Sequence, residues 1–93
     1  MKEMDFSLAT TEEIIKELAL RAKQKRKRSS TRYGSQKDFS AHIGMSYRSY
    51  QAFEISGKIT LEKFIDVLRG LDTINDIEGL LKIQDEELFN EHI

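Results

Sequence analysis

The chain has 93 residues with a formal net charge of −1, and 39% of the residues are hydrophobic and 33% charged. This length supports one domain with a modest core, and the composition is that of an ordinary globular chain. No apolar run approaches the roughly 20 residues that a membrane helix needs, and the acid-containing N-terminus has no signal-peptide core. The lack of cysteine excludes disulfides, thiol nucleophiles and the usual cysteine-based zinc clusters. Since proline is also absent and glycine is rare, the composition favours helices.

The small net charge conceals an uneven distribution of charge along the chain. Eight bases and no acid lie between Arg21 and Lys37, whereas residues 72–93 contain seven acids and a single base, Lys82. A charge-balanced chain with one basic region can still bind a polyanion, because the local potential matters more than the sum. A solvated helix face would explain the same run of bases about as well.

The first predicted helix covers about residues 11–27. Thr10 or Thr11 supplies a hydroxyl cap, and two acids follow near the positive end of the helix dipole. Apolar residues recur after this cap at helical spacing, namely Ile14, Ile15, Leu18 and Ala22. The basic run falls in the last turns of this helix, and residues 1–10 form an N-terminal arm without clear periodicity.

Two short helices joined by a tight turn are predicted between Gly34 and Gly57. Ser35 caps the first, with Asp38 at capping-box spacing, and Gly44 ends it as a left-handed residue would. Ser46 caps the second, which closes at Gly57.

Helical periodicity divides the residues of this pair into an inner and an outer set. The residues that we expect to face the core are Phe39, Ile43, Tyr50 and Phe53. The residues of the second helix that we expect to face away from it are Tyr47, Arg48, Ser49, Gln51 and Ala52.

Two further helices are predicted in the C-terminal part. Thr60 caps the first, whose apolar stripe comprises Leu61, Phe64, Ile65, Leu68 and Leu71. The second covers about residues 73–82 and carries Ile74, Ile77, Leu80 and Leu81. An acidic tail, residues 83–93, follows. The sequence therefore predicts a single all-α domain with a five-helix core over residues 11–82.

Two short helices separated by Gly-Met-Ser are typical of a helix-turn-helix, in which glycine permits the reversal and an apolar residue fills the angle between the helices. The chain resembles the Xre family of helix-turn-helix regulators, which includes phage Cro and related repressors, over about residues 11–81. The matching residues are Ser35, Gln36, Phe39, Ile43, Gly44, Met45, Ser46, Tyr50, Phe53, Glu54 and Gly57. It departs from the family at Ser40, where alanine is common, and at Ser56, where glycine is common.

The resemblance implies a lambda-repressor-like fold and a sequence-specific transcriptional regulator, in particular a repressor, that reads the major groove of double-stranded DNA. It also implies a cytoplasmic protein of bacterial or phage origin. The residues 54–61, Glu-Ile-Ser-Gly-Lys-Ile-Thr-Leu, resemble a subgroup often found beside HipA-type kinase toxins. An antitoxin that binds such a kinase and autoregulates its operon is therefore an alternative.

Base contacts are expected from the outer set of the second helix of the pair. Arg48 is the first choice, because a guanidinium can pair in bidentate fashion with guanine. Tyr47 can meet a thymine methyl group or a phosphate. By resemblance, the positions of Tyr47, Arg48 and Ala52 read bases, and Ser49 and Gln51 complete the expected set.

Phosphate contacts would position the protein without specifying the DNA sequence. By resemblance, Gln36 is the family's phosphate clamp. The other candidates for phosphate contact are Arg32, Lys37, Ser46 and Lys58. Glu54 has a structural role by resemblance, since this position pairs with an arginine of the first helix; the sequence leaves Arg26 and Arg28 open as partners.

A homodimer is expected, because a single module buries limited surface and two half-sites would supply the affinity. The candidate dimer residues are Leu80, Leu81, Leu88 and Phe89, which alternatively close the core of a monomer. We expect no enzyme activity, catalytic residue, metal or cofactor, because no nucleophile constellation, phosphate loop or metal-ligand spacing is present. A protein-interaction module without DNA binding is a further alternative.

Overall fold

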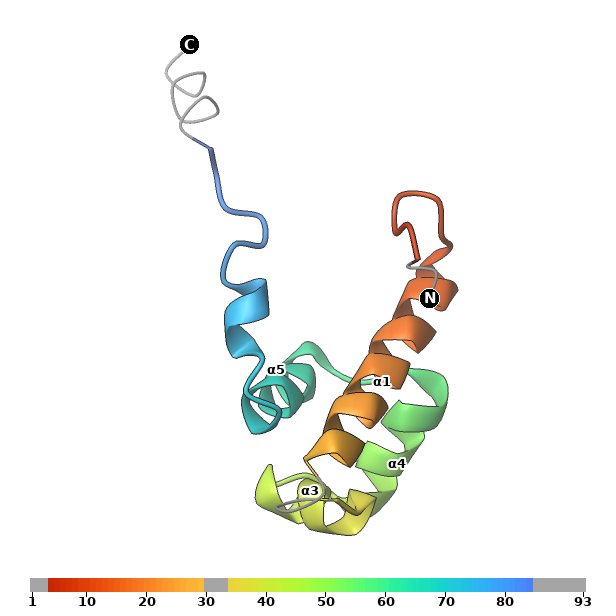
Figure 1. Cartoon of the computed structure of the whole chain (residues 1–93), viewed down its shortest axis with the longest axis vertical. Coiled ribbons are helices and arrows are strands. Elements are labelled where there is room, and N and C mark those ends of the chain that lie inside the picture. The colour runs from red at the N-terminus through yellow and green to blue at the C-terminus, as the bar shows by residue number, and fades with distance from the viewer. Residues whose placement is uncertain (1–3, 30–33, 85–93) are drawn as a thin grey trace.

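The computed structural model describes residues 4–29 and 34–84. These residues form four α-helices and one short 3-10 helix and contain no strand (Figure 1). The elements are α1 (Thr11–Arg28), α3 (Gln36–His42), α4 (Tyr47–Ser56), α5 (Leu61–Gly70) and η1 (Ile74–Ile77). The described part of the chain is thus all-helical, as predicted. None of its helices combines the length and the apolar character required to cross a membrane.

Each α-helix begins after a hydroxyl side chain that accepts a hydrogen bond from a backbone N–H in the first turn, and these caps are Thr10, Ser35, Ser46 and Thr60. Between the two threonines left open by the sequence, the cap of α1 is Thr10. It forms a full capping box, because Glu13 N–H donates to the Thr10 hydroxyl at 3.1 Å and Thr10 N–H donates to the Glu13 carboxylate at 2.8 Å. The starts predicted from the sequence for these four α-helices are confirmed.

A compact turn connects α3 to α4. Gly44 adopts the left-handed conformation, with φ 72°. Its N–H donates to the Ala41 carbonyl at 3.2 Å, and the Met45 N–H donates to the Ser40 carbonyl at 2.9 Å. This pair of bonds is the Schellman arrangement, which satisfies the last carbonyls of α3 and leaves Met45 buried under the turn. Ser46, the next residue, caps α4, so the connection between the two helices is short.

The predicted fifth helix over residues 73–82 is wrong in type and extent. The chain forms only the four-residue 3-10 helix η1, preceded by Asp72 with φ 57° and followed by turns. The segment is short and contains Asn75, Asp76 and Gly79, all of which disfavour an α-helix. Ile74 and Ile77 are half-buried, but Leu80 and Leu81 are exposed, so the segment has too little apolar contact to compensate.

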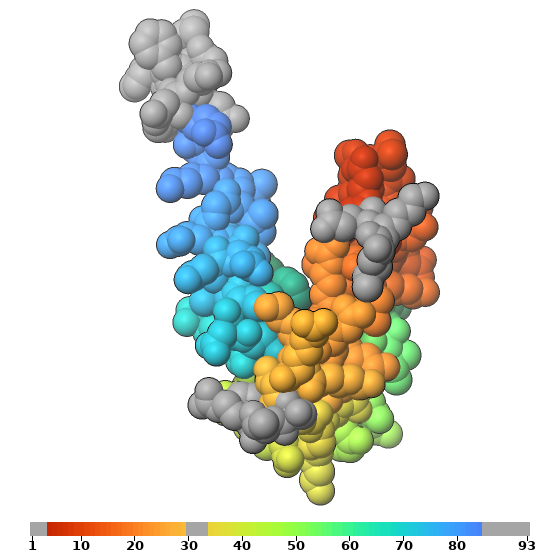
Figure 2. Space-filling model, viewed as in Figure 1, coloured from red at the N-terminus to blue at the C-terminus, as the bar shows by residue number. Residues whose placement is uncertain are grey.

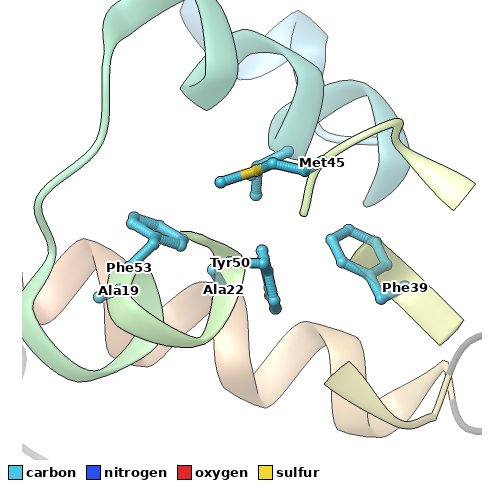
Figure 3. Close-up of a cluster of buried hydrophobic side chains, with 7 residues drawn as sticks. Ala19, Ala22, Phe39, Met45, Tyr50 and Phe53 are labelled. Atoms are coloured by element: carbon cyan, nitrogen blue, oxygen red, sulfur yellow. The ribbon is translucent and has the colours of Figure 1, made fainter. Parts of the chain in front are cut away.

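The core is a small cluster contributed by all four α-helices (Figure 3). Three aromatic rings succeed one another through it: Phe39 and Tyr50 have ring centroids 5.1 Å apart, and Tyr50 and Phe53 lie 5.9 Å apart. These predicted core residues are all fully buried. Sequence periodicity missed Ala19 and Val67, which are fully buried as well, and it wrongly placed Leu61 inside, since that side chain is 72% exposed.

Helix α4 packs mainly on α1, and α3 lies across the C-terminal end of α1 (Figure 1). Ala19 and Ala22 lie on the packed side of α1 and allow α4 to approach closely. At the far end of α4, Gly57 has φ 80°, and a Cβ there would lie 2.1 Å from the Ile15 side chain. Helix α4 therefore lies close to α1 both at the two alanines and at its own C-terminal end.

Candidate nucleic-acid interface

The solvent face of α4 contains the residues that the sequence assigned to base reading. Tyr47, Arg48, Ser49, Gln51 and Ala52 are all exposed, and Tyr47 is 45% exposed. On the opposite side, Tyr50 and Phe53 are fully buried. Their burial fixes the rotation of α4 about its axis and therefore determines which side chains point outward.

The only acid of α4, Glu54, is removed from this surface by an ion pair with Arg26 of α1. Arg26 Nε donates to Glu54 Oε2 at 2.7 Å, and Arg26 Nη2 donates to Glu54 Oε1 at 3.0 Å. The two side chains are 5% and 2% exposed. Arg26, rather than Arg28, is therefore the partner that the sequence left open. The pairing leaves α4 without an exposed negative charge.

Gln36 joins this pair to α3. Its side-chain Nε2 donates to Glu54 Oε1 at 2.8 Å, and Arg26 Nη1 donates to the backbone carbonyl of Gly34, just before α3. The four groups link α1, α3 and α4 through one network, which is buried at the ion pair and partly buried at Gln36 and Gly34. The sequence predicted only a phosphate contact for Gln36 and missed this internal bond, because nothing in the local sequence indicates that Gln36 and Glu54 meet.

The contacts of this network shift the pKa values of its titratable groups. Burial by itself would raise the pKa of Glu54, but the hydrogen bonds from Arg26 and Gln36 and the positive charge of Arg26 outweigh it, so the pKa lies below its ordinary value. The hydrogen bond to Glu54 likewise raises the pKa of Arg26. Burial, together with the nearby Glu54 carboxylate, raises the pKa of Tyr50. The Tyr50 hydroxyl lies close enough to feel that charge, yet it has no hydrogen bond of good geometry.

The candidate phosphate contacts surround this helix pair. Lys37 of α3, Ser46 at the start of α4 and Lys58 after α4 are exposed. The Ser46 hydroxyl oxygen accepts the Ser49 N–H at 3.1 Å as the cap of α4, and its own hydrogen can still be donated. Arg32 lies outside the described residues.

The basic run contributes less surface charge than its count suggests. Arg26 is buried and neutralised by Glu54. Arg21 forms an ion pair with Glu17 at 2.8 Å and lies 5.1 Å from the centroid of the Phe6 ring. Lys25, Lys27 and Arg28 remain exposed at the C-terminal end of α1, near α3.

Of the four candidate dimer residues, Leu80 and Leu81 are 66% and 98% exposed. Leu88 and Phe89 lie outside the described residues. Within the described ranges, no group of histidines and carboxylates is arranged to hold a metal ion. Comparisons with protein-family models, with curated proteins and with solved structures find no match to this chain.

Proposed function

We propose that this chain is a sequence-specific double-stranded DNA-binding regulator of the helix-turn-helix type, as its resemblance to the Xre family implies, and that α4 enters the major groove. One observation carries the proposal. The exposed face of α4 presents an arginine, a tyrosine, a glutamine and a serine, while its only acid is buried against Arg26. A helix that approaches phosphates without an exposed acid avoids like-charge repulsion with the DNA backbone.

Arg48 and Tyr47 are the principal base-reading residues in this proposal. Both stand in the first turn of α4, directly after the Ser46 cap, and both are exposed. A recognition helix contacts base edges chiefly with its N-terminal residues. The guanidinium of Arg48 would pair with the O6 and N7 atoms of guanine, and Tyr47 would contact a thymine methyl group.

Lys37, Lys58 and Ser46 would contact phosphates on either side of the groove. They would contribute to affinity and to its salt dependence more than to sequence preference. Gln36 has a double duty in this proposal. One hydrogen of its amide is donated to Glu54, and the second is available for a phosphate.

A homodimer would place two α4 helices on half-sites about one helical turn apart, roughly 34 Å. The exposed Leu80 and Leu81 supply the apolar surface for self-association. Each copy would then read one half of an approximately palindromic operator.

The decisive experiment is a salt titration of binding to a random-sequence duplex, followed by selection from a random DNA library. The logarithm of Kd should rise linearly with the logarithm of the salt concentration. The selection should converge on a palindromic site. A K37A/K58A double variant should reduce the slope, whereas K63A, which removes an exposed lysine of α5, should leave it unchanged. No measurable salt slope would refute DNA binding and favour a protein-interaction module.

A second candidate, an antitoxin that binds a kinase-like toxin, is favoured by apolar surface away from the α4 face. Leu61, which follows α4 in the chain, is 72% exposed. Leu61 borders a cavity of about 410 Å³ formed by α1 and the segment after α4. Isothermal titration with the protein encoded by the adjacent gene would test this candidate, and a Leu61→Asp variant should abolish that binding while DNA binding persists.

A further inference from the structure

An apolar cleft separates α1 from the C-terminal segment of the described chain (Figure 2). It has a volume of about 400 Å³. Its apolar lining includes Phe6, Leu18, Phe64, Leu68, Ile77 and Leu80. This is the size of a typical ligand pocket, and most of the lining residues are apolar.

The same chain carries an exposed apolar segment beside this cleft, residues 80–83, here called the C-terminal arm. Leu80, Leu81 and Ile83 are 66%, 98% and 48% exposed. Only Leu80 borders the cleft. Leu81 also has φ 60°, a conformation that is costly for a residue with a side chain. Clustered apolar side chains of this kind mark an interaction surface more often than an ordinary monomer surface.

We propose that the cleft between α1 and α5–η1 receives the C-terminal arm of a second copy of this chain, in a reciprocal two-fold exchange. The molecule carries both halves of the interface, an apolar arm and an apolar cleft. Leu81 and Ile83 lie outside the cleft of their own chain, so a fold-back would require the arm to leave its described position. In a two-fold dimer each arm is buried in the cleft of the other copy, and the same set of contacts occurs twice.

The charged residues around the cleft also favour the C-terminal arm of a second copy as its occupant. Arg21 and Lys25 lie on the α1 wall of the cleft, and Asp76 lies on the opposite wall. Three acids, residues 85–87, follow the arm in the sequence. In sign, these acids complement Lys25 of the cleft, and Lys82 of the arm itself complements Asp76. The inference rests on the proposed dimer but does not depend on DNA binding.

The first test measures the mass of the full chain by sedimentation equilibrium over a range of concentrations, without DNA. The unmodified chain should dimerise, and Leu81→Asp should weaken the dimer at least tenfold, because it places a charge in an apolar cleft at two symmetric positions. Leu8→Asp is the matched control: Leu8 is 84% exposed and does not border the cleft, so its dimer should be unchanged.

The second test places the arm in the cleft directly and uses the absence of native cysteine. A tagged Leu81→Cys protein is mixed with an untagged Lys25→Cys protein and treated with a short bismaleimide. The mixed, cross-linked pair should form. Lys27→Cys, exposed on α1 but not on the cleft, should not form it.

The outcomes separate the possible errors. A dimer that persists in Leu81→Asp, or a mixed pair that forms equally with Lys27→Cys, would overturn the arm-in-cleft arrangement while leaving the proposed dimer intact. A monomer at every concentration would overturn both. Cross-linking within one chain of a Lys25→Cys/Leu81→Cys double variant, without mixed pairs, would show that the arm folds back instead.

Discussion

Arg26 of α1 and Glu54 of α4, 28 residues apart in the sequence, form a two-bond ion pair that is almost fully buried. Each charge is satisfied by the other and by one further contact, the Gly34 carbonyl for Arg26 and the Gln36 amide for Glu54. Loss of one partner leaves the other charge unpaired in a site that is almost fully shielded from solvent, and this costs more than the pair itself contributes.

We therefore expect Arg26→Met and Glu54→Leu each to lower the free energy of unfolding by about 3–5 kcal/mol, and the double variant to lose much less than their sum. Urea denaturation of the parent, the two single variants and the double variant would complete this double-mutant cycle. The exposed Lys16–Glu12 pair is the control, since Lys16→Ala should cost under about 1 kcal/mol. Additive losses in the double variant would contradict the coupling.

The depressed pKa of Glu54 makes stability depend on acid pH. Its ordinary value is 4.5, and in the folded state the pKa lies lower, so the unfolded chain takes up the proton first as the pH falls. The contribution is complete above about pH 4.5 and should be lost as the pH drops through the folded-state pKa. Carbon-NMR titration of the Glu54 carboxyl group should give a midpoint below 4.5. A midpoint above that value would mean that desolvation dominates.

Gly44 and Gly57 provide a matched pair, because both have positive φ but only one is crowded. Gly44→Ala should cost about 1–2 kcal/mol from backbone strain alone, since nothing lies within 4 Å of the added Cβ. Gly57→Ala should cost a further 1–3 kcal/mol or so, because its Cβ would meet the Ile15 side chain and carbonyl. Thermal unfolding would compare them, and equal losses would show that Ile15 yields without cost.

Gln36→Ala should reduce stability as well as any DNA affinity. The variant removes a hydrogen bond to the charged Glu54, and such bonds contribute about 1.5–3 kcal/mol. Lys37→Ala, one residue away and exposed, should leave the free energy of unfolding within about 0.5 kcal/mol of the parent. If Gln36→Ala is as stable as Lys37→Ala, the hydrogen bond to Glu54 contributes nothing to the free energy of unfolding.

Arg48→Ala tests base reading apart from folding. Arg48 is exposed on α4, so its removal should not alter stability, but affinity for the selected DNA site should fall by about 1–3 kcal/mol, roughly 5- to 150-fold in Kd. Affinity for random duplex should stay nearly constant. Fluorescence anisotropy would measure the affinity for both duplexes. Equal losses of affinity for the selected site and for random duplex would indicate that Arg48 contacts a phosphate.

Local sequence determined the α-helices, because their ends are encoded within a few residues. Thr10, Ser35, Ser46 and Thr60 each satisfy a backbone N–H of their own first turn, and Gly44 supplies the one backbone conformation that the turn requires. The burial of Phe39, Tyr50 and Phe53 followed from helical periodicity. The outward set of α4 followed from the same rule.

Tertiary structure decided the contacts between helices and the fate of segments without strong local signals. Arg26 continues the buried side of α1 begun by Ala19 and Ala22, a spacing that favours it over Arg28 only once that side is known to pack on α4. The bond from Gln36 to Glu54 depends on the relative placement of two helices, which neither helix encodes alone. Residues 73–82 have helical spacing but too little packing surface, and so short a segment does not become an α-helix without it.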